Sequence, residues 1–303
     1  MNRAFPMPAP GPHGGDGWRL AAALGVHPDR ILDLSASLNP VAPDPVPVVA
    51  AHLGALRRYP DPTRAEAALA ATMGVDPDLL VLTNGGAEAI ALVAQLLPEG
   101  RVDEPDFSLY RRHLSSVHGG GARWRSNPHN PTGLLALPGE AAAVWDEAFW
   151  PLATGTWTRG DTAAGSLVLG SLTKLLACPG LRLGYVICPD PATALQVRNR
   201  RPAWSVNGPA VAALPDLLTP VDLPGWAARV AALRSELAGV LERAGYRPRR
   251  SDANWLLVDA PELRDRLARA GICVRDCTSF GMPGTVRIAV PGPEGIQRIG
   301  AAL

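Results

Sequence analysis

A single lysine stands in an almost uncharged stretch of the sequence, G-S-L-T-K-L-L-A-C-P-G-L-R-L-G-Y, which covers residues 170–185. Arg182 follows this residue, Lys174, eight positions later. Lysine side chains normally lie at protein surfaces, so an apolar setting needs an explanation. Either the ammonium group reaches water past its aliphatic stem, or burial lowers the pKa of the amine and makes it a nucleophile that can form an imine.

Two further motifs could bind the anionic and polar atoms of a ligand. In T-N-G-G-A-E-A-I, residues 83–90, a glycine turn joins an apolar strand to a helix, and the N–H groups of Gly85, Gly86 and Ala87 would form an anion site at the helix N-terminus. In S-N-P-H-N-P-T-G, residues 126–133, two Asn-Pro steps exclude a helix interior and hold Asn130 in a rigid loop. Each motif also has a purely conformational interpretation, as a tight glycine turn or a stiff proline turn.

A carboxylate and a hydroxyl complete the set of candidate site residues. Asp146, in V-W-D-E-A-F, follows an apolar strand, where ligands meet the strand ends of parallel sheets. It could hold a cationic ring nitrogen, or it could cap the next helix. Ser171 and Arg182 would add a hydroxyl and a two-pronged guanidinium suited to a phosphate. Taken together and in this order, the motifs favour a site for a phosphate-bearing ligand around Lys174.

Composition excludes several classes of function. The 303 residues carry 29 Lys and Arg against 28 Asp and Glu, a net charge of +1, which argues against a nucleic-acid or membrane-surface partner. The four cysteines show neither a C-x-x-C pair nor zinc-ligand spacing, so we expect reduced thiols and no metal site. The N-terminus lacks the apolar region of a signal peptide, and no apolar run reaches the roughly 20 residues that span a bilayer. These features predict a cytoplasmic protein.

The order of apolar segments predicts an α/β fold with two lobes. Short strands alternate with helices between about residues 80 and 187, which is typical of a mostly parallel sheet in a large α/β/α lobe. A long helix beginning near Pro224 leads into a strand–helix–strand–strand–helix pattern, which predicts a smaller α+β lobe. We expect residues 45–215 to form the large domain, and residues 1–44 and 216–303 to form the small one.

Two helices before the first glycine motif can be predicted in detail. Residues 46–60 have the pattern of one amphipathic helix that is stopped by Pro60. The next helix should begin at Thr63, with Thr63 as N-cap and Glu66 completing a capping box.

The combined motifs N-P-x-N-P-T-G, D-E-A-F, S-L-T-K and G-L-R-L-G-Y resemble those of the fold-type-I pyridoxal-phosphate enzymes of the class I/II aminotransferase superfamily. The resemblance covers nearly the whole chain and implies the aspartate aminotransferase fold with pyridoxal 5'-phosphate as cofactor. It also implies that Lys174 forms the Schiff base, that Asp146 pairs with the pyridinium nitrogen, and that Asn130 donates to the ring 3-oxygen.

The same resemblance assigns the remaining cofactor contacts. The residues implied to hold the phosphate are Gly85, Gly86, Ala87, Ser171 and Arg182. Phe107, in E-P-D-F-S-L-Y, would stack on the ring, and Tyr59, in R-R-Y-P-D-P, would reach the cofactor phosphate of a neighbouring subunit, which implies a homodimer. Phe149 departs from the superfamily pattern, which often has a tyrosine that bonds to the 3-oxygen at this position.

One branch of the superfamily matches both ends of the chain. H-G-G-D at residues 13–16, L-D-L-S-A-S-L-N-P and Y-P-D-P resemble the L-threonine-O-3-phosphate decarboxylases of cobalamin biosynthesis, although Asp16 and Ser37 stand where that branch has asparagine. This resemblance implies decarboxylation of a small phosphorylated amino acid to (R)-1-aminopropan-2-yl phosphate. The residues that would share the substrate's phosphate and carboxylate are His13, Asn39, Arg275 and Arg287.

Two alternatives remain. A histidinol-phosphate aminotransferase shares every cofactor motif, and the N-terminal H-G-G sequence is the feature that separates it from the decarboxylases. A non-catalytic homologue that keeps the fold, such as a scaffold or regulator, is disfavoured because Lys174 and Asp146 are both present.

Overall fold

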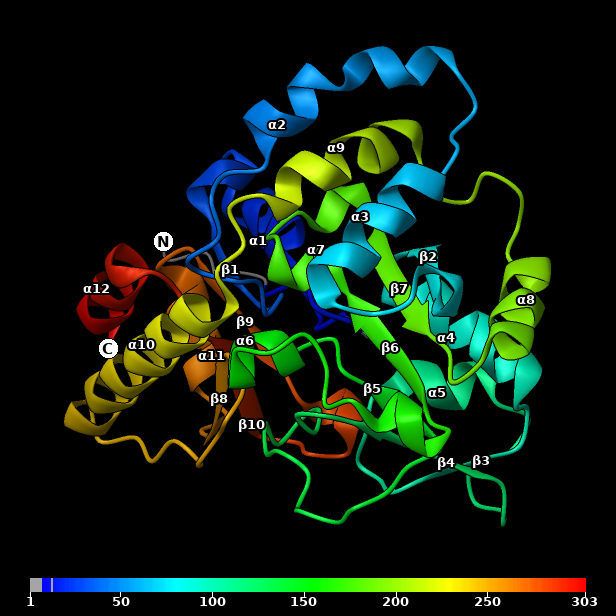
Figure 1. The fold of residues 1–303 in the computed structure, drawn as a ribbon. Coiled ribbons are helices and arrows are strands. Elements are labelled where there is room, and N and C mark those ends of the chain that lie inside the picture. Colours follow the sequence, from blue (N-terminus) through cyan, green and yellow to red (C-terminus); the bar gives the residue numbers. More distant parts are fainter. Residues whose placement is uncertain (1–6, 12) are drawn as a thin grey trace.

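The computed structural model of the protein describes residues 7–11 and 13–303. Residues 1–6, which belong to the predicted small domain and to the segment inspected for a signal peptide, lie outside the described residues, as does residue 12. Two sheets organise the chain, a large one drawn in cyan to green and a small one drawn mostly in orange and brown in Figure 1.

The large sheet has the order β2-β7-β6-β5-β4-β3. Its strands are β2 (Leu80–Asn84), β3 (Gly100–Val102), β4 (Ala122–Ser126), β5 (Val144–Asp146), β6 (Leu167–Ser171) and β7 (Leu183–Ile187). Strands β3, β4, β5 and β6 are parallel neighbours, whereas β7 is antiparallel to both β6 and β2. The prediction of a mostly parallel sheet is therefore confirmed, and the carboxyl ends of β4, β5 and β6 lie at one edge.

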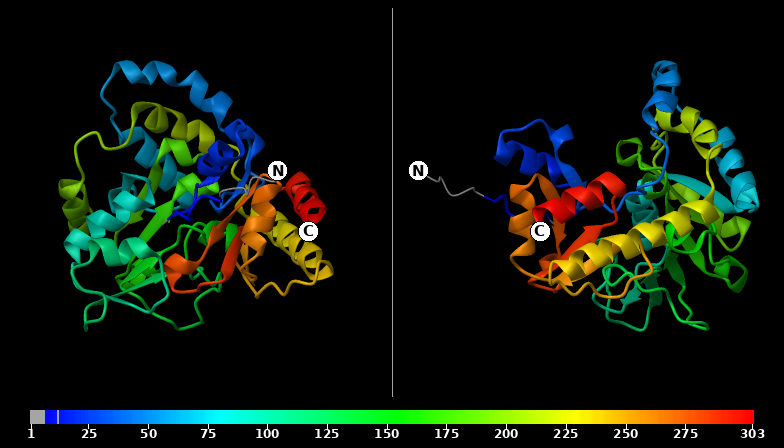
Figure 2. Two further views of the ribbon diagram at one scale, coloured as in Figure 1. Left: turned by 180° about the vertical axis from the view of Figure 1, so that it is seen from behind. Right: turned by 90° about the vertical axis from the view of Figure 1, so that its left-hand side faces the viewer.

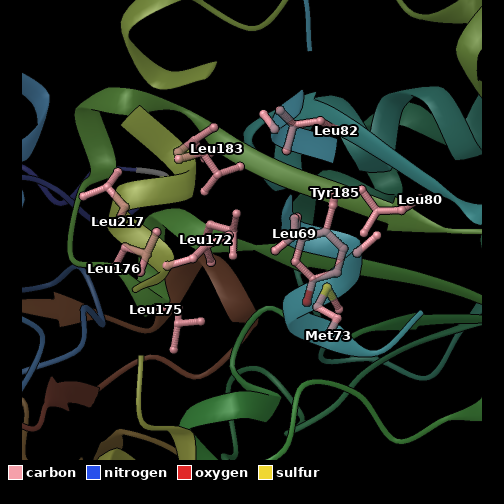
Figure 3. Packing of buried hydrophobic residues seen from close by; sticks show 14 of the residues in the cluster. Leu69, Met73, Leu80, Leu82, Leu172, Leu175, Leu176, Leu183, Tyr185 and Leu217 are labelled. Atoms are coloured by element: carbon pink, nitrogen blue, oxygen red, sulfur yellow. The ribbon is translucent and has the colours of Figure 1, made fainter. Parts of the chain in front are cut away.

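Apolar side chains cover both faces of this sheet, as the strand period of two requires. Leu80 and Leu82 of β2 join one buried cluster, while Val81 between them joins a cluster on the opposite face. Figure 3 shows the first cluster, in which Leu80 of β2 and Tyr185 of β7 lie beside Leu69 and Met73.

Helices close each face. The first cluster is covered by α3 (Thr63–Met73), α7 (Leu172–Leu175) and α9 (Gly208–Leu218), and the second by α4 (Gly85–Leu96), α5 (Ser108–His113) and α8 (Pro191–Arg200). The short helix α6 (Trp150–Thr154) lies against α10 (Leu223–Arg243). The result is the predicted three-layer α/β/α arrangement.

The small sheet joins the two ends of the chain. Its order is β1-β9-β10-β8, made of β1 (Leu32–Leu34), β8 (Trp255–Asp259), β9 (Ile272–Asp276) and β10 (Thr285–Ala289). Strand β1 pairs in parallel with β9, so the N-terminal segment lies beside C-terminal elements, as both views of Figure 2 show. Helices α10, α11 (Leu263–Arg269) and α12 (Pro293–Ala302) pack on this sheet, and α1 (Gly17–Leu24) lies near β9.

The domain boundaries at residues 45 and 215 stay a prediction. Among the residues that the structure describes, no helix has the length and apolar character needed to cross a membrane.

The single helix predicted over residues 46–60 is wrong. The segment forms α2 (Val46–Ala51) and then a 3₁₀ helix, Leu53–Arg57, and none of the residues in either element is fully buried. Gly54 lowers helix propensity at the break. A helix this short needs a packed apolar face to persist, and most of this segment lies at the surface, at the top of Figure 1.

The capping box predicted for α3 is also wrong, although the helix begins at Thr63 as expected. Asp61 accepts both the Thr63 N–H (3.0 Å) and the Thr63 hydroxyl (2.6 Å), so the threonine side chain is already used as a donor. Glu66 turns toward the sheet, where it accepts from the Leu82 N–H (2.9 Å) and from Arg201 (2.8 Å). The capping box does not form, because Thr63 bonds to the upstream carboxylate of Asp61 and Glu66 bonds to residues of distant segments.

Candidate active site

A cavity of about 280 Å³ opens where the carboxyl ends of β4, β5 and β6 face the small sheet. A crevice beyond strand ends is the usual ligand site of open α/β sheets. Most of the site residues predicted from the sequence line it, namely His13, Gly86, Ala87, Phe107, Asn130, Asp146, Ser171, Lys174, Arg182, Arg275 and Arg287. The motifs therefore meet in one place.

Three predicted residues do not line this cavity. Gly85 lies just behind it with φ +77°, and a Cβ there would collide with the Arg182 guanidinium, so glycine is needed for Arg182 to approach. Asn39 is buried, and its side-chain atoms bond to the backbone. Tyr59 is 78% exposed on the outer surface and stacks on Trp204 with ring centroids 4.6 Å apart.

Lys174 lies on α7, directly after β6, and lines the cavity while its neighbours Leu172 and Leu175 pack into the core. Burial lowers the pKa of the Lys174 amine to about 8, helped by the positive charges of Arg287 and Arg182 and opposed by Asp33 and Asp146. The Nζ atom lies 5.9 Å from the centroid of the Phe149 ring. An amine with a pKa this low is partly neutral at physiological pH and can act as a nucleophile.

Asp146 ends β5 and is held by two donors. Its Oδ2 accepts from the Tyr110 hydroxyl (2.7 Å), and its Oδ1 accepts from the Ala148 N–H (3.0 Å). Burial raises the pKa of this carboxyl, and the tyrosine hydrogen bond opposes that rise. Asp146 is the only carboxylate among the described residues that line the cavity. A cationic group placed beside it would gain a fixed and poorly hydrated counter-charge.

The cradle predicted for a phosphate is built from two strand ends and one helix start. Gly86 and Ala87 lie in the first turn of α4, and Ser171, at the end of β6, lies beside Gly86. The Ser171 and Thr173 hydroxyls are 2.7 Å apart, and both residues line the cavity. Arg182 has φ +57°, a left-handed conformation that is strained for a residue with a Cβ and that is typical of functional positions. Backbone N–H groups, hydroxyls and a guanidinium are the donors that a phosphate accepts.

The buried carboxyl of Asp106, which the sequence did not reveal, holds the side of the cavity that is lined by Phe107 and Asn130. Asp106 accepts from the Phe107 N–H (2.7 Å) and from both the N–H and the hydroxyl of Ser126. The Ser126 hydroxyl in turn accepts from the Asn130 N–H (2.8 Å). Burial raises the pKa of Asp106 to about 7 against these donors. The network ties the predicted stacking residue, Phe107, to the predicted amide donor, Asn130.

The small-sheet side of the cavity is cationic. Arg287 is buried over the Trp255 ring (4.9 Å), and its Nη1 donates to Asn130 Oδ1 (2.6 Å) while its Nε is buried without a partner among the described residues. Burial lowers the pKa of Arg287 to about 10. Arg275, on the neighbouring strand, is cross-strand partner to Arg287. The buried Arg287 guanidinium favours an anionic ligand on this side of the cavity.

The loop that carries His13 is built onto strand β1. A Cβ at Gly14 would collide with the Ser35 carbonyl, and the Ser35 hydroxyl accepts from the N–H groups of Gly15 (2.8 Å) and Asp16 (3.2 Å). His13 thereby lines the cavity, with its Nδ1 buried and unpaired among the described residues. Burial and the charge of Arg275 lower the pKa of His13. Gly14 is needed for this close approach and Gly15 has φ +93°, a conformation that favours glycine, so the H-G-G sequence is more than a flexible turn.

Some functional signals in the sequence were missed. Tyr110, on the short helix α5, was not identified, because its role depends on a hydrogen bond to Asp146, 36 positions away, which no local pattern records. Lys174 is also the single lysine of the sequence, a count that by itself separates it from the surface cations. Phe149 lines the cavity and packs against Trp255 with ring centroids 4.7 Å apart, so an apolar ring stands where the superfamily often has a tyrosine.

Comparisons with known proteins agree with this geometry. Residues 106–299 match the family model described as aminotransferase class I and II. A threonine-phosphate decarboxylase of Salmonella typhimurium is 30% identical, over 96% of this chain and 95% of the relative. A histidinol-phosphate aminotransferase of Symbiobacterium thermophilum is also 30% identical, over 92% of this chain and 91% of the relative.

A solved structure shows the same fold. The histidinol-phosphate aminotransferase from Sinorhizobium meliloti, in complex with pyridoxal-5'-phosphate, has a TM-score of 0.81 at 19% identity, over 100% of this chain and 97% of that chain. The chain thus spans nearly the full length of the proteins that it resembles.

Proposed function

Because the chain belongs to the class I and II aminotransferase family, whose cofactor is pyridoxal phosphate, we propose that it decarboxylates L-threonine O-3-phosphate to (R)-1-aminopropan-2-yl phosphate for cobalamin biosynthesis. The observation that carries the proposal is the His13 loop, which adds a histidine to the cationic small-sheet side of the cavity. That side suits a substrate with two anionic groups, and the H-G-G sequence of the loop is the feature that sets the decarboxylase branch apart.

The residues of the cavity fit the cofactor. Lys174 supplies the amine for covalent attachment, Asp146 a carboxylate for the ring nitrogen, and Arg182 with Ser171 and the α4 N-terminus the donors for the phosphate. When bound, the cofactor supplies an electron-accepting ring conjugated to the substrate nitrogen. Asp146 keeps a proton on the ring nitrogen through charge pairing, and this proton makes the ring a better electron acceptor.

The protein's remaining task is to choose which bond of the substrate breaks. We propose that Arg287, the strongest positive neighbour of Lys174, holds the substrate carboxylate, and that Arg275 with His13 holds the phosphate. In this pose the chain would orient the bond from Cα to the carboxylate for cleavage, the carboxylate would leave as carbon dioxide, and the bound cofactor would supply the acceptor for the bonding electrons. Lys174 then delivers one proton to Cα, so that one amine product forms for each carbon dioxide.

The lowered pKa of Lys174 predicts the pH dependence of cofactor attachment. Only the neutral amine attacks an aldehyde, and at pH 7 about a tenth of an amine with pKa near 8 is neutral. The attachment rate of pyridoxal phosphate to the apoprotein should therefore rise between pH 6 and 8 and level off above pH 8. Stopped-flow absorbance measures this rate. A rate that keeps rising to pH 10 would show that the amine has the pKa of an exposed lysine.

Tyr110→Phe should weaken the site without damaging the fold. Loss of the hydroxyl removes a hydrogen bond that lowers the pKa of Asp146, so less of the carboxylate is ionised to hold the ring nitrogen. We expect kcat and cofactor affinity each to fall about tenfold, as for a hydrogen bond to a charged group worth about 1.5 kcal/mol. The matched control is Tyr246→Phe, whose tyrosine lies outside the cavity. Equal effects in the two variants would contradict the assignment.

A second candidate function is transamination of histidinol phosphate. The relative from Symbiobacterium thermophilum carries that name at the same identity as the decarboxylase, and the two activities share the cofactor contacts. Transamination would require a 2-oxo acid as second substrate, whereas decarboxylation requires none.

The discriminating experiment is an assay with purified protein, pyridoxal phosphate and L-threonine O-3-phosphate in the absence of any 2-oxo acid. The decarboxylase proposal expects continuous release of carbon dioxide over many turnovers. Activity that appears only with histidinol phosphate and 2-oxoglutarate together would overturn it in favour of the aminotransferase.

We further propose a cytoplasmic homodimer in which Tyr59 reaches the neighbouring subunit's cofactor phosphate. In support, Tyr59 and Trp204 form an aromatic pair that is 78% and 61% exposed, and the φ of Trp204 is +57°. Large exposed aromatics commonly mark an interface. The four cysteines are unpaired, as expected for a reducing compartment.

A further inference from the structure

The side chain of Asn39 is turned away from the cavity and toward the backbone of the lysine helix. Asn39 is 4% exposed, and its amide Nδ2 donates to the Leu175 carbonyl (2.9 Å) while its Oδ1 accepts from the Val41 N–H (3.1 Å). Its own backbone N–H donates to the Lys174 carbonyl (3.0 Å). Both polar atoms of the side chain are therefore engaged, which leaves little capacity for the substrate contact that the sequence suggested.

These bonds meet a specific need of α7. The helix has only four residues, Leu172–Leu175, and the last carbonyls of any helix have no partner within it. Asn39 supplies donors to two consecutive carbonyls, those of Lys174 and Leu175, from a segment far away in the sequence. The direction in which the Lys174 side chain leaves the backbone is thereby fixed from outside the helix.

The segment that carries Asn39 is itself held from the small sheet. Asn254, fully buried just before β8, donates through its amide to the carbonyls of Ser37 (3.0 Å) and Leu38 (3.1 Å). The Val290 N–H, after β10, donates to the Asn254 carbonyl (2.9 Å). Residues 37–39 therefore form a strap that joins the small sheet to the backbone of Lys174.

We propose that Asn39 is a positioning residue for Lys174, and that it acts through the backbone of α7 without contacting the substrate. Proton transfer and imine formation both require the Lys174 amine to lie within a fraction of an ångström of the position from which it reacts. The proposal rests on Lys174 carrying the cofactor and is independent of whether the reaction is decarboxylation or transamination.

The test uses Asn39→Asp in the full-length protein. This substitution keeps the acceptor for Val41 and replaces the donor to Leu175 with an oxygen that repels the carbonyl. The first readout needs no substrate: pyridoxal phosphate is added to the apoprotein, and its attachment is followed by absorbance and fixed by borohydride. Because Lys174 is the single lysine, fixed cofactor is assigned to it by mass spectrometry, with the N-terminal amine as the only competing primary amine.

We expect the attachment rate to fall at least about tenfold and kcat to fall about 10- to 100-fold, while KM changes less than about threefold, because a misplaced reacting group costs rate more than binding. A KM raised about tenfold or more, with the attachment rate unchanged, would overturn the proposal and restore Asn39 as a substrate ligand. Unchanged attachment and kcat would also overturn it. Failure of wild-type Lys174 to become labelled would instead refute the cofactor assignment itself.

Two further variants separate positioning from general damage. Ser166→Ala also loses a buried side-chain donor to the carbonyl of a distant residue, Ala142 (2.7 Å), but it lies outside the cavity. It should attach cofactor at the wild-type rate, and equal losses in both variants would overturn the proposal. If Asn39→Asp does not fold, Asn39→Ala removes the side-chain donor to Leu175 without adding charge, and the same measured outcomes support or overturn the proposal.

Discussion

Replacing Lys174 with alanine is expected to lower turnover by more than about 10³-fold, because under the proposed function the variant loses both the amine that attaches the cofactor and the group that moves protons at the substrate. The fold should persist, since the neighbours of Lys174 on α7, not its amine, pack into the core. The absorbance of cofactor bound in the cavity should disappear, and borohydride should fix none beyond what the N-terminal amine takes up. Kinetics, absorbance and mass spectrometry on one preparation measure these effects.

Lys174→Arg is the matched control, because it keeps a positive charge in the cavity but cannot attach to an aldehyde. If the charge of Lys174 were its main contribution, arginine would restore turnover to within about tenfold of wild type, and the account of Lys174 as nucleophile would be contradicted. Retention of the wild-type amount of fixed cofactor in Lys174→Ala would contradict it equally, because the sequence contains no other lysine and the label would then lie on the N-terminal amine.

Asp146→Asn should produce the second largest loss, about 10²- to 10³-fold in kcat, by removing a preorganised charge from a poorly hydrated site. The amide oxygen can still accept from the Ala148 N–H while its NH2 donates to the Tyr110 hydroxyl, so both contacts of the side chain are kept while the charge is lost. The cofactor should still attach to Lys174. Absorbance during turnover and kcat/KM distinguish this electronic loss from a loss of binding.

Asp33→Asn provides the comparison for this prediction. Asp33 also influences the charge state of Lys174 but does not line the cavity, so its loss should change kcat far less than the loss of Asp146. An Asp146→Asn variant with kcat within about tenfold of wild type would contradict the role of Asp146 as partner of the ring nitrogen.

The alternation of strands and helices was readable because burial on both faces of a sheet leaves a strong apolar pattern. The strand at Leu80–Asn84 and the helix beginning at Gly85 follow directly from V-L-T-N-G-G, and the structure confirms both. The single helix predicted for the segment after Asp44 was wrong because this segment is little buried. Its apolar residues pack only partly on the core, so no buried stripe extends α2 beyond Ala51.

The candidate reactive residues of the site could be predicted from the sequence more readily than the residues that hold them in place. Lys174, Asp146 and Arg182 could be identified because each stands at the end of an apolar strand or in an uncharged run. Tyr110 and Asp106 could not, because their importance comes from contacts with residues 36 and 20 positions away, which no local pattern records. Asn39 shows the same limit, since its motif signals that it matters but not that its amide faces the backbone of α7.

A single experiment in deuterated water shows which group leaves the reacting carbon of the substrate and which atom replaces it. If threonine phosphate loses its carboxylate in this cavity, each turnover should yield one carbon dioxide and one amine carrying a single non-exchangeable deuterium on the carbon that bore the carboxylate. Mass spectrometry of the product reads this directly. Recovery of a 2-oxo acid that keeps the carboxylate and has lost the amino group would contradict the account.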